Sequence, residues 1–203
     1  MKFEYYNVDE EIIRIPISES YKDCITLIRS DRYRIVGKKE SLCRLILNIM
    51  KPYSPSILFW FRLCAYKGYL FPFCRFMYVR ACHRAQVDIP YSTKIGYGFY
   101  LGHNMCIVIN GGTIIGNNVD VSQFLNIGTN KKSPAIIGNN VYIGPHVSIV
   151  ENVKIGCSTT IGAGAVVVKN TPANSTVVGI PAKVIHYNNP GRYVENRYPL
   201  IHI

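Results

Sequence analysis

The 203-residue sequence has few acidic residues and no long apolar segment. Twelve Asp and Glu residues face 23 Lys and Arg residues, and the resulting net charge of +11 favours acidic partners such as phosphates, anionic glycans or a membrane surface. No uncharged apolar run reaches 18 residues, and the N-terminus lacks the basic start and apolar stretch of a signal peptide. We therefore expect a cytoplasmic protein.

Several common site patterns are also absent. The seven cysteines are odd in number, scattered and without a C-x-x-C pair (Cys24, Cys43, Cys64, Cys74, Cys82, Cys106 and Cys157), so we expect free buried thiols and no metal. No G-x-S-x-G element is present, which argues against an acyl-enzyme formed on serine. Despite the positive charge, no known nucleic-acid-binding module is present, and we expect no nucleic-acid partner.

What the sequence does contain is an isoleucine or valine at every sixth position. Two runs show it: Ile109, Ile115, Val121 and Ile127, then Ile137, Ile143, Ile149, Ile155, Ile161 and Val167. Eight of the nine intervals are six residues long, and a glycine follows most of these positions. This period fits neither a helix nor simple strand alternation and is typical of a parallel β-helix with one hexad per flat face. The alternative, a β-sandwich, would show turn spacings near 8 to 12.

The rest of the chain has a different pattern. Residues 1–85 have no hexads but show helical spacing over 23–28, 41–50 and 57–83, with Pro52, Pro55 and Pro72 as breaks. We predict a mainly β protein with a helical cap domain over 1–85, a β-helix domain over 86–184 and a C-terminal tail over 185–203. The aromatic and basic segment 56–78 is interpreted as a core or subunit-packing helix pair, with peripheral membrane contact as the alternative.

His103 and Asp88 are the candidate catalytic residues. His103 is at an outward position of its hexad, and Asp88 lies fifteen residues earlier, where the helical region meets the first coil. Since a coil takes roughly eighteen residues, this separation places the two residues on neighbouring coils. Two solvated residues without a role are the alternative. His146 is also outward, and we expect it to be a surface residue.

One interval, from Ile127 to Ile137, is ten residues instead of six. The four extra residues must bulge from the coil, and a long loop on such a repeat protein often marks the binding face. Lys131 and Lys132 in this loop are suited to a phosphate. A tolerated surface excursion is the alternative.

These residues resemble the hexapeptide-repeat acyltransferases, and within them the serine acetyltransferase-like branch. The resemblance covers about residues 86–184 and rests on Val87-Asp-Ile-Pro90, Lys94-Ile-Gly-x-Gly98, Leu101-Gly-His103, Ile107-Val-Ile109 and Gly179-Ile-Pro-Ala-Lys183. It implies a left-handed β-helix, against the usual handedness of parallel crossovers. It also implies that Asp88 and His103 form a catalytic dyad.

The resemblance further implies an acetyl-CoA-dependent O-acetyltransferase. His103 would be the general base on the acceptor hydroxyl, and Asp88 would orient the imidazole and stabilise its charged form. The residues implied to contact CoA are Gly128, Thr129, Lys132, Gly144, Pro145, Gly162, Ala163 and Lys183. The groove for CoA would lie between two subunits, so a homotrimer is implied, and pairing of trimers into a hexamer is a further option.

Three departures from serine acetyltransferases bear on the acceptor. Gly102 replaces an Asp before the catalytic His, Lys132-Ser133 replaces an Arg-His pair, and Gly111 replaces an acidic residue. We therefore rank a sugar hydroxyl of a surface polysaccharide above serine, although the terminal Ile203 is a feature in favour of serine. A β-helix scaffold without catalytic activity is the non-enzymatic alternative.

Overall fold

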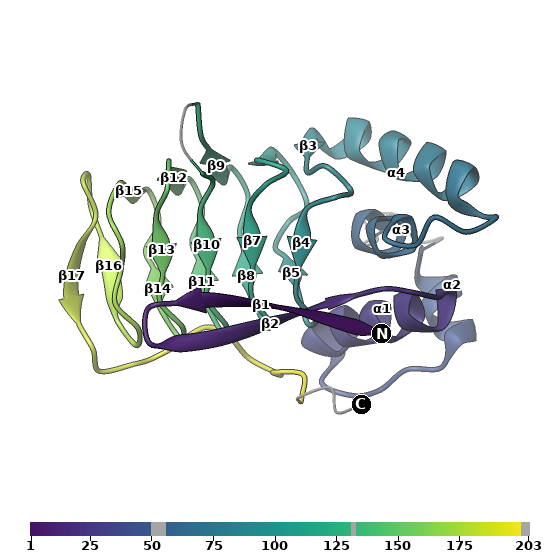
Figure 1. Cartoon of the computed structure of the whole chain (residues 1–203), viewed down its shortest axis with the longest axis horizontal. Helices are drawn as coiled ribbons and strands as arrows, with labels where there is room; N and C mark the ends of the chain where they lie inside the picture. The colour runs from purple at the N-terminus through teal and green to yellow at the C-terminus, as the bar shows by residue number, and fades with distance from the viewer. Residues whose placement is uncertain (50–55, 131–132, 200–203) are drawn as a thin grey trace.

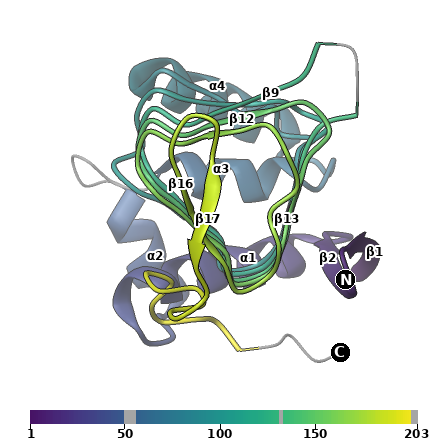
Figure 2. The same cartoon turned by 90° about the vertical axis from the view of Figure 1, so that its left-hand side faces the viewer.

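Hexad spacing places one inward side chain on each flat face of a coil, and three faces close each turn. The computed structural model describes residues 1–49, 56–130 and 133–199. It consists of stacked triangular coils with helices at one end and a hairpin along one side (Figure 1). Viewed along the stack, the coils superimpose in a triangular outline (Figure 2).

Each face of the coil stack is a sheet of short strands that pair in parallel. Face 1 contains β3 (Val87–Asp88), β6 (Ile107–Ile109), β9 (Asn126–Gly128), β12 (Ser148–Val150) and β15 (Val166–Val167). Face 2 contains β4 (Lys94–Ile95), β7 (Ile114–Ile115), β10 (Ile136–Ile137) and β13 (Lys154–Ile155). Face 3 contains β5 (Tyr100–Leu101), β8 (Asp120–Val121), β11 (Tyr142–Ile143), β14 (Thr160–Ile161) and β16 (Thr176–Val178), with β17 (Lys183–His186) added in antiparallel orientation.

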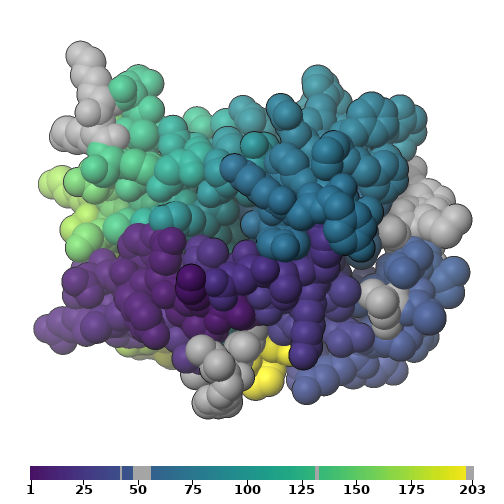
Figure 3. All heavy atoms as spheres, turned by 45° about the vertical axis from the view of Figure 1, so that its right-hand side comes forward, coloured from purple at the N-terminus to yellow at the C-terminus, as the bar shows by residue number. Residues whose placement is uncertain are grey.

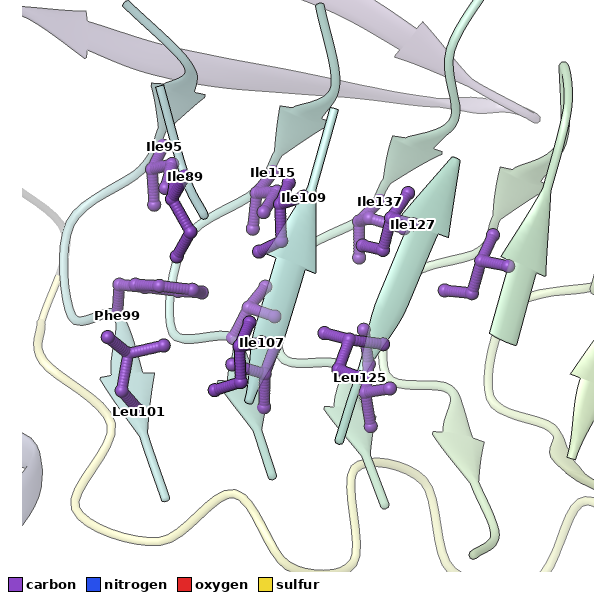
Figure 4. Close-up of a cluster of buried hydrophobic side chains, with 14 of the residues drawn as sticks. Ile89, Ile95, Phe99, Leu101, Ile107, Ile109, Ile115, Leu125, Ile127 and Ile137 are labelled. Carbon is purple, nitrogen blue, oxygen red and sulfur yellow. The ribbon is translucent and has the colours of Figure 1, made fainter. Parts of the chain in front are cut away.

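The sixth-position aliphatics form continuous inward ladders, as the period predicts. On face 1, Ile109 is in register with Ile127, and Ile127 with Ile149. All three side chains are buried, and the ladders of the first coils are seen from the side in Figure 4. Stacking of this kind buries the apolar face of each hexad only when neighbouring coils are present.

Side-chain hydrogen bonds at one corner also join the coils. Between faces 2 and 3, Asn117 Oδ1 accepts from the Tyr97 N–H at 3.1 Å, and Asn139 Oδ1 accepts from the Asn117 N–H at 2.8 Å. The ladder ends at Cys157, whose Sγ accepts from the Asn139 N–H at 3.2 Å. Each coil thus satisfies a backbone donor of the coil before it.

The coils differ in length, and the differences fall at three places. The last coil is the shortest, since Thr160 pairs with Thr176, sixteen residues on. Val108 pairs with Asn126 and Ser148 with Val166, eighteen residues apart as expected. Asn126 pairs with Ser148, twenty-two residues on, because the segment after β9 leaves the triangular outline. The first coil is also longer than expected, since Val87 pairs with Ile107, twenty residues on. Its two extra residues lie in the corner that contains His103.

The helical cap comprises α1 (Tyr21–Val36), α2 (Leu42–Ile49), α3 (Ser56–Cys64) and α4 (Phe71–Ala85). Ser20 caps α1 by accepting from the Asp23 N–H, and Gly37 ends the helix with φ of 68°. The predicted helical stretch over 57–83 is two helices, and Pro72 lies in the first turn of α4 instead of ending a helix. Pro52 and Pro55 lie outside the described residues.

A β-hairpin that the sequence pattern did not predict precedes the cap helices. It consists of β1 (Lys2–Val8) and β2 (Glu11–Ile17), and lies across the coils beside the helices (Figure 3). Ile13 and Ile15 are fully buried and pack toward Ile114 and Ile136 on the outside of face 2. The hairpin therefore covers apolar side chains that point out of the β-helix, so residues 1–85 are not wholly helical.

A buried ion pair joins the cap to the first coil. Arg62 on α3 is 2% exposed and donates from Nε to Asp31 Oδ2 at 2.8 Å. Arg62 Nη1 also donates to Ile95 O at 2.7 Å, and Asp31 Oδ1 accepts from the Phe99 N–H at 2.8 Å. The pair thus satisfies backbone groups at the open end of the coil stack, where no preceding coil can do so.

The C-terminal tail packs against the coils up to the last described residues. Tyr198 exchanges two hydrogen bonds with the Asn118 side chain, at 2.8 and 3.1 Å. Arg34 on α1 donates to Glu195 O at 2.8 Å and lies 2.7 Å from Asp120 on β8. The tail therefore helps to connect α1 to face 3. Ile203 lies outside the described residues.

Breaking the buried pair is expected to destabilise the protein far more than breaking an exposed one. Asp31→Asn leaves the Arg62 charge buried and without a charged partner, which we expect to cost about 3 kcal/mol of unfolding free energy. The control, Glu4→Gln, removes the exposed pair between Glu4 and Lys94 at 2.6 Å and is expected to cost less than about 1 kcal/mol. Chemical denaturation followed by circular dichroism measures both values. Equal losses in the two variants would contradict the role assigned to the buried pair.

Candidate active site

His103 lies in an enlarged corner between β5 and β6. The corner, residues 102–106, begins with the Gly102 N–H donating to Val121 O at 2.7 Å. His103, Asn104 and Cys106 have φ of 61°, 46° and 52°. Left-handed backbone is uncommon for such residues and persists only where the surrounding structure enforces it. The corner thus projects His103, which is exposed, out of the coil.

Asp88 lies at the start of the first coil, almost one full turn before His103 and on the same side of the molecule. It is the second residue of β3, pairs with Val108 and is exposed on face 1. Because the first coil has twenty residues, His103 precedes the in-register partner of Asp88 by five residues. The structure therefore places the two candidate residues slightly less than one turn of the coil apart, with a larger offset than an eighteen-residue coil would give.

The two side chains are open to a ligand. Within the described part of the chain, neither Asp88 nor His103 makes a hydrogen bond or ion pair. Catalytic hydrogen bonds often tighten only when substrate is bound. Asn104 Oδ1, in the His103 corner, is buried without a hydrogen-bond partner among the described residues. Buried hydrogen-bond acceptors in native proteins nearly always have a partner. Asn104 Oδ1 is therefore available to accept a hydrogen bond from a ligand or from a second subunit.

The residues implied to contact CoA divide into two groups. Gly144 and Pro145 follow β11, and Gly162 and Ala163 follow β14, so both pairs lie above the His103 corner, between faces 3 and 1. Lys183 begins β17 beside Val178 at the far end of the same stack. Gly128 and Thr129 lie at the opposite edge of face 1, and Lys132 is outside the described residues. The structure thus does not gather all of these residues at one edge of a single subunit.

The glycines of the two groups differ in how much space a Cβ atom would have at each position. A Cβ on Gly144 would lie 2.9 Å from Ala163 N, and a Cβ on Gly162 would lie 2.6 Å from Val178 Cγ1. Gly144 is therefore required for the coils to stack, because its neighbour is backbone, whereas a Cβ on Gly162 would meet only a side-chain methyl group of Val178. A Cβ on Gly128 would meet nothing closer than Asn126 Oδ1 at 3.8 Å. The stacking of the coils gives no reason for a glycine at 128.

His146 lies on the same corner column and is exposed, as expected. Its ring stacks on that of Phe124, with centroids 4.4 Å apart and an interplanar angle of 15°. Together with the exposed Met105 and Val108, these rings give an apolar surface next to His103.

A pocket of about 620 Å³ lies between α4 and the first coil. We call it the Asp88 pocket, and its lining residues are Arg75, Tyr78, Val79, Cys82, His83, Gln86, Val87, Asp88, Ile89, Pro90 and Tyr91. Burial raises the pKa of Tyr78 and of Cys82, and the negative charge of Asp88 adds to both effects. Sequence analysis missed the contribution of α4 to this pocket, although Arg75 and His83 are eight residues apart and so lie on one helix face.

Within the described residues, no helix is long and apolar enough to cross a bilayer. The same residues contain no group of three His, Cys, Asp or Glu side chains placed to hold a metal ion. The seven cysteines are free, as expected, but only Cys24, Cys64, Cys74 and Cys157 are fully buried.

Comparison with known proteins gives the family. The family model for the bacterial transferase hexapeptide (six repeats) matches residues 134–169. A serine acetyltransferase of Staphylococcus aureus is 30% identical over 165 residues, which span 76% of this chain and 76% of that protein. The chain belongs to the serine acetyltransferase family of hexapeptide-repeat acyltransferases.

Other members of the serine acetyltransferase family match over different lengths. The enzyme of Buchnera aphidicola is 41% identical over 104 residues, but these span only 49% of this chain and 40% of that protein. A crystal structure of serine acetyltransferase in complex with coenzyme A from Brucella abortus superimposes with a TM-score of 0.64 at 24% identity. That superposition covers 81% of this chain and 68% of the other. The predicted fold class, a left-handed parallel β-helix with a helical region at its N-terminus, is confirmed.

The difference between the glycines can be measured. Gly144→Ala brings a Cβ against the backbone of the next coil, and we expect a loss of at least about 2 kcal/mol, or roughly 4–8 °C in the melting temperature. Gly128→Ala is the matched control and is expected to melt within about 1 °C of the wild type, because its Cβ makes only an ordinary van der Waals contact with Asn126 Oδ1 at 3.8 Å. Thermal unfolding by circular dichroism decides this. A stable Gly144→Ala variant would show that the stack tolerates the extra atom.

Proposed function

We propose that this chain transfers an acetyl group from acetyl-CoA to a hydroxyl acceptor. The observation that carries the proposal is the placement of His103 and Asp88 about one turn of the coil apart, in a chain of the serine acetyltransferase family. Both are exposed, and neither makes a hydrogen bond or ion pair among the described residues. The solved relative from Brucella abortus is in complex with coenzyme A, which supports the same donor here.

His103 acts as the general base in this proposal. Its imidazole takes the proton of the acceptor hydroxyl as the oxygen attacks the thioester carbonyl. The carbon–sulfur bond then breaks, and the imidazolium returns the proton to the CoA sulfur. A positioned base of this kind contributes roughly 10² to 10⁴ in rate. Asp88 holds the imidazole in the required tautomer and stabilises its positive charge.

For the acceptor, the relatives favour L-serine. The proteins of Staphylococcus aureus and Buchnera aphidicola are both named serine acetyltransferases, which reverses the ranking of a polysaccharide sugar above serine. We therefore propose serine as the acceptor. The glycan remains the second candidate because Gly102 and Gly111 stand where acidic residues are expected in serine acetyltransferases.

We also propose that the working form is a homotrimer. The residues implied to contact CoA lie at opposite edges of face 1, so a groove between two subunits, formed by one edge from each, would bring them together. Exposed apolar side chains along face 1 and its corner support a contact between copies: Met105, Val108, Phe124, Val150 and Val168. Pairing of trimers into a hexamer is a further option for the cap.

Peripheral membrane contact is a separate proposal for the outer face of α4. Phe73 and Phe76 are 57% and 64% exposed, and Arg80 and Arg84 lie on the same helix. Apolar and basic side chains on one helix are typical of helices that lie at an anionic membrane surface. Such contact would place the protein at the inner face of the cytoplasmic membrane.

The first test is CoA release from acetyl-CoA, with L-serine, neutral sugars and glycan fragments as acceptors. We expect turnover with L-serine that falls by at least about 10²-fold in His103→Ala and in Asp88→Asn, because the base or its orientation is lost. Asp9→Asn, in the hairpin turn, is the control and is expected to keep the wild-type rate. Turnover on a glycan alone would select the second candidate. No turnover that depends on His103 with any acceptor would refute the transfer proposal.

The membrane proposal is tested by sedimentation with anionic phosphatidylglycerol vesicles at low salt. We expect at least half of the protein to sediment with the vesicles and most of it to remain in solution when Phe76 and Arg80 are replaced together (Phe76→Ser, Arg80→Gln). Vesicles of phosphatidylcholine are the control, since they lack the negative charge. Protein that ignores the anionic vesicles would rule the proposal out.

A further inference from the structure

The Asp88 pocket has the size of a small-molecule site. Its volume of about 620 Å³ falls within the roughly 300–1,000 Å³ of known ligand pockets. Tyr78 donates a hydrogen bond from its hydroxyl to Ile89 O, and both residues line the pocket. This bond holds α4 against the first coil, so the pocket is formed before any ligand arrives.

The pocket adjoins the corner that contains His103. Cys106, the last residue of that corner, donates from Sγ to Gln86 Oε1 at 3.3 Å and from its backbone N–H to Ala85 O at 3.0 Å. Gln86 itself lines the pocket. A ligand in the pocket therefore lies beside Asp88 and next to the loop that carries His103.

The pocket is on the cap side of His103, away from the coils implied to hold CoA. Gly144 and Pro145 directly follow β11, Gly162 and Ala163 directly follow β14, and both strands lie toward the C-terminal end of the stack (Figure 1). If acetyl-CoA binds along the C-terminal end of the stack, the hydroxyl acceptor must approach His103 from the cap end, because the two substrates have to meet at the imidazole. The Asp88 pocket opens on that side.

The charge around the pocket favours an anion. Arg75 lines it, is exposed and makes no hydrogen bond or ion pair within the described part of the chain. Asp88 is the only carboxylate in the lining, and residues 41–87 contain seven Lys and Arg but no Asp or Glu. An unpaired guanidinium in such a setting is suited to a carboxylate, which it can bind with two parallel hydrogen bonds.

We propose that the Asp88 pocket binds the acceptor and that Arg75 selects acceptors carrying a carboxylate. The ligand class is a small hydroxyl compound with an anionic group, whether an amino acid or an acidic sugar. The pocket would position the hydroxyl between Asp88 and His103 while Arg75 holds the carboxylate. This inference rests on the proposed acetyl transfer, of which it specifies the acceptor.

Isothermal titration calorimetry of the full chain, with CoA present at saturation, tests the pocket without requiring turnover. The probes are L-serine and D-glucuronate, which carry a carboxylate, and L-serinamide and D-glucose, which do not. We expect at least one carboxylate probe to bind, and to bind about 10-fold or more weakly to Arg75→Gln. Binding of its neutral counterpart is expected to be weak in the wild type and unchanged in the variant.

The matched control is Arg80→Gln, one helical turn further along α4 and outside the pocket, which is expected to bind the carboxylate probe as the wild type does. Equal weakening in both variants, equal binding of charged and neutral probes, or no binding of any probe would overturn the proposal. The two proposals fail separately. A carboxylate probe that binds through Arg75, with no CoA release dependent on His103, would leave the pocket in place and remove the acetyl transfer.

Discussion

In-register stacking of the coils is the constraint on which the rest of the structure depends. Each face accepts inward aliphatic side chains in register from coil to coil, and the corner between faces 2 and 3 leaves room for little more than a glycine and a hydrogen-bonding side chain. Gly116 shows how strict this is, since a Cβ there would lie 2.4 Å from Gly138 O. Residues in excess of six per face cannot be accommodated within the triangular coil. They must leave the outline, and they do so at the His103 corner and after β9.

Departures from the six-residue spacing therefore provide the positions at which side chains can leave the coil and form a functional site. The corner at 102–106 keeps three residues in left-handed backbone in order to return to the ladder at Ile107. The His103 side chain is exposed there and projects out of the coil, almost one turn after Asp88. A regular corner, such as the one at His146, leaves its side chain stacked on the coil below.

The open end of the stack imposes the second requirement. The first coil has no predecessor to accept its backbone groups, and the pair of Asp31 and Arg62 supplies partners to Ile95 and Phe99. These contacts seat α1 and α3 on the coil, and the Tyr78 hydrogen bond seats α4 beside β3. The cap is thus both a plug for the apolar interior and one wall of the Asp88 pocket, which links the stability of the fold to the proposed acceptor site.

Hexad periodicity alone predicted the stacked coils, because the period is local and each repeat specifies the same turn. The left-handed sense of the coils and the pairing of Asp88 with His103 came from the resemblance to hexapeptide-repeat acyltransferases. The periodicity also indicated the excess residues after Ile127. The two extra residues at the His103 corner were not predicted, because Leu101 and Ile107 are themselves six residues apart and so keep the hexad spacing.

Only the tertiary structure decided how the non-repeating segments meet the coils. The hairpin at 2–17 was missed because its inward residues, Ile13 and Ile15, become buried only against the outside of face 2. The sequence likewise does not distinguish Arg75 from the other basic residues, because its place in the Asp88 pocket depends on the packing of α4 next to Asp88. Contacts of this kind join residues far apart in the chain, and no local period specifies them.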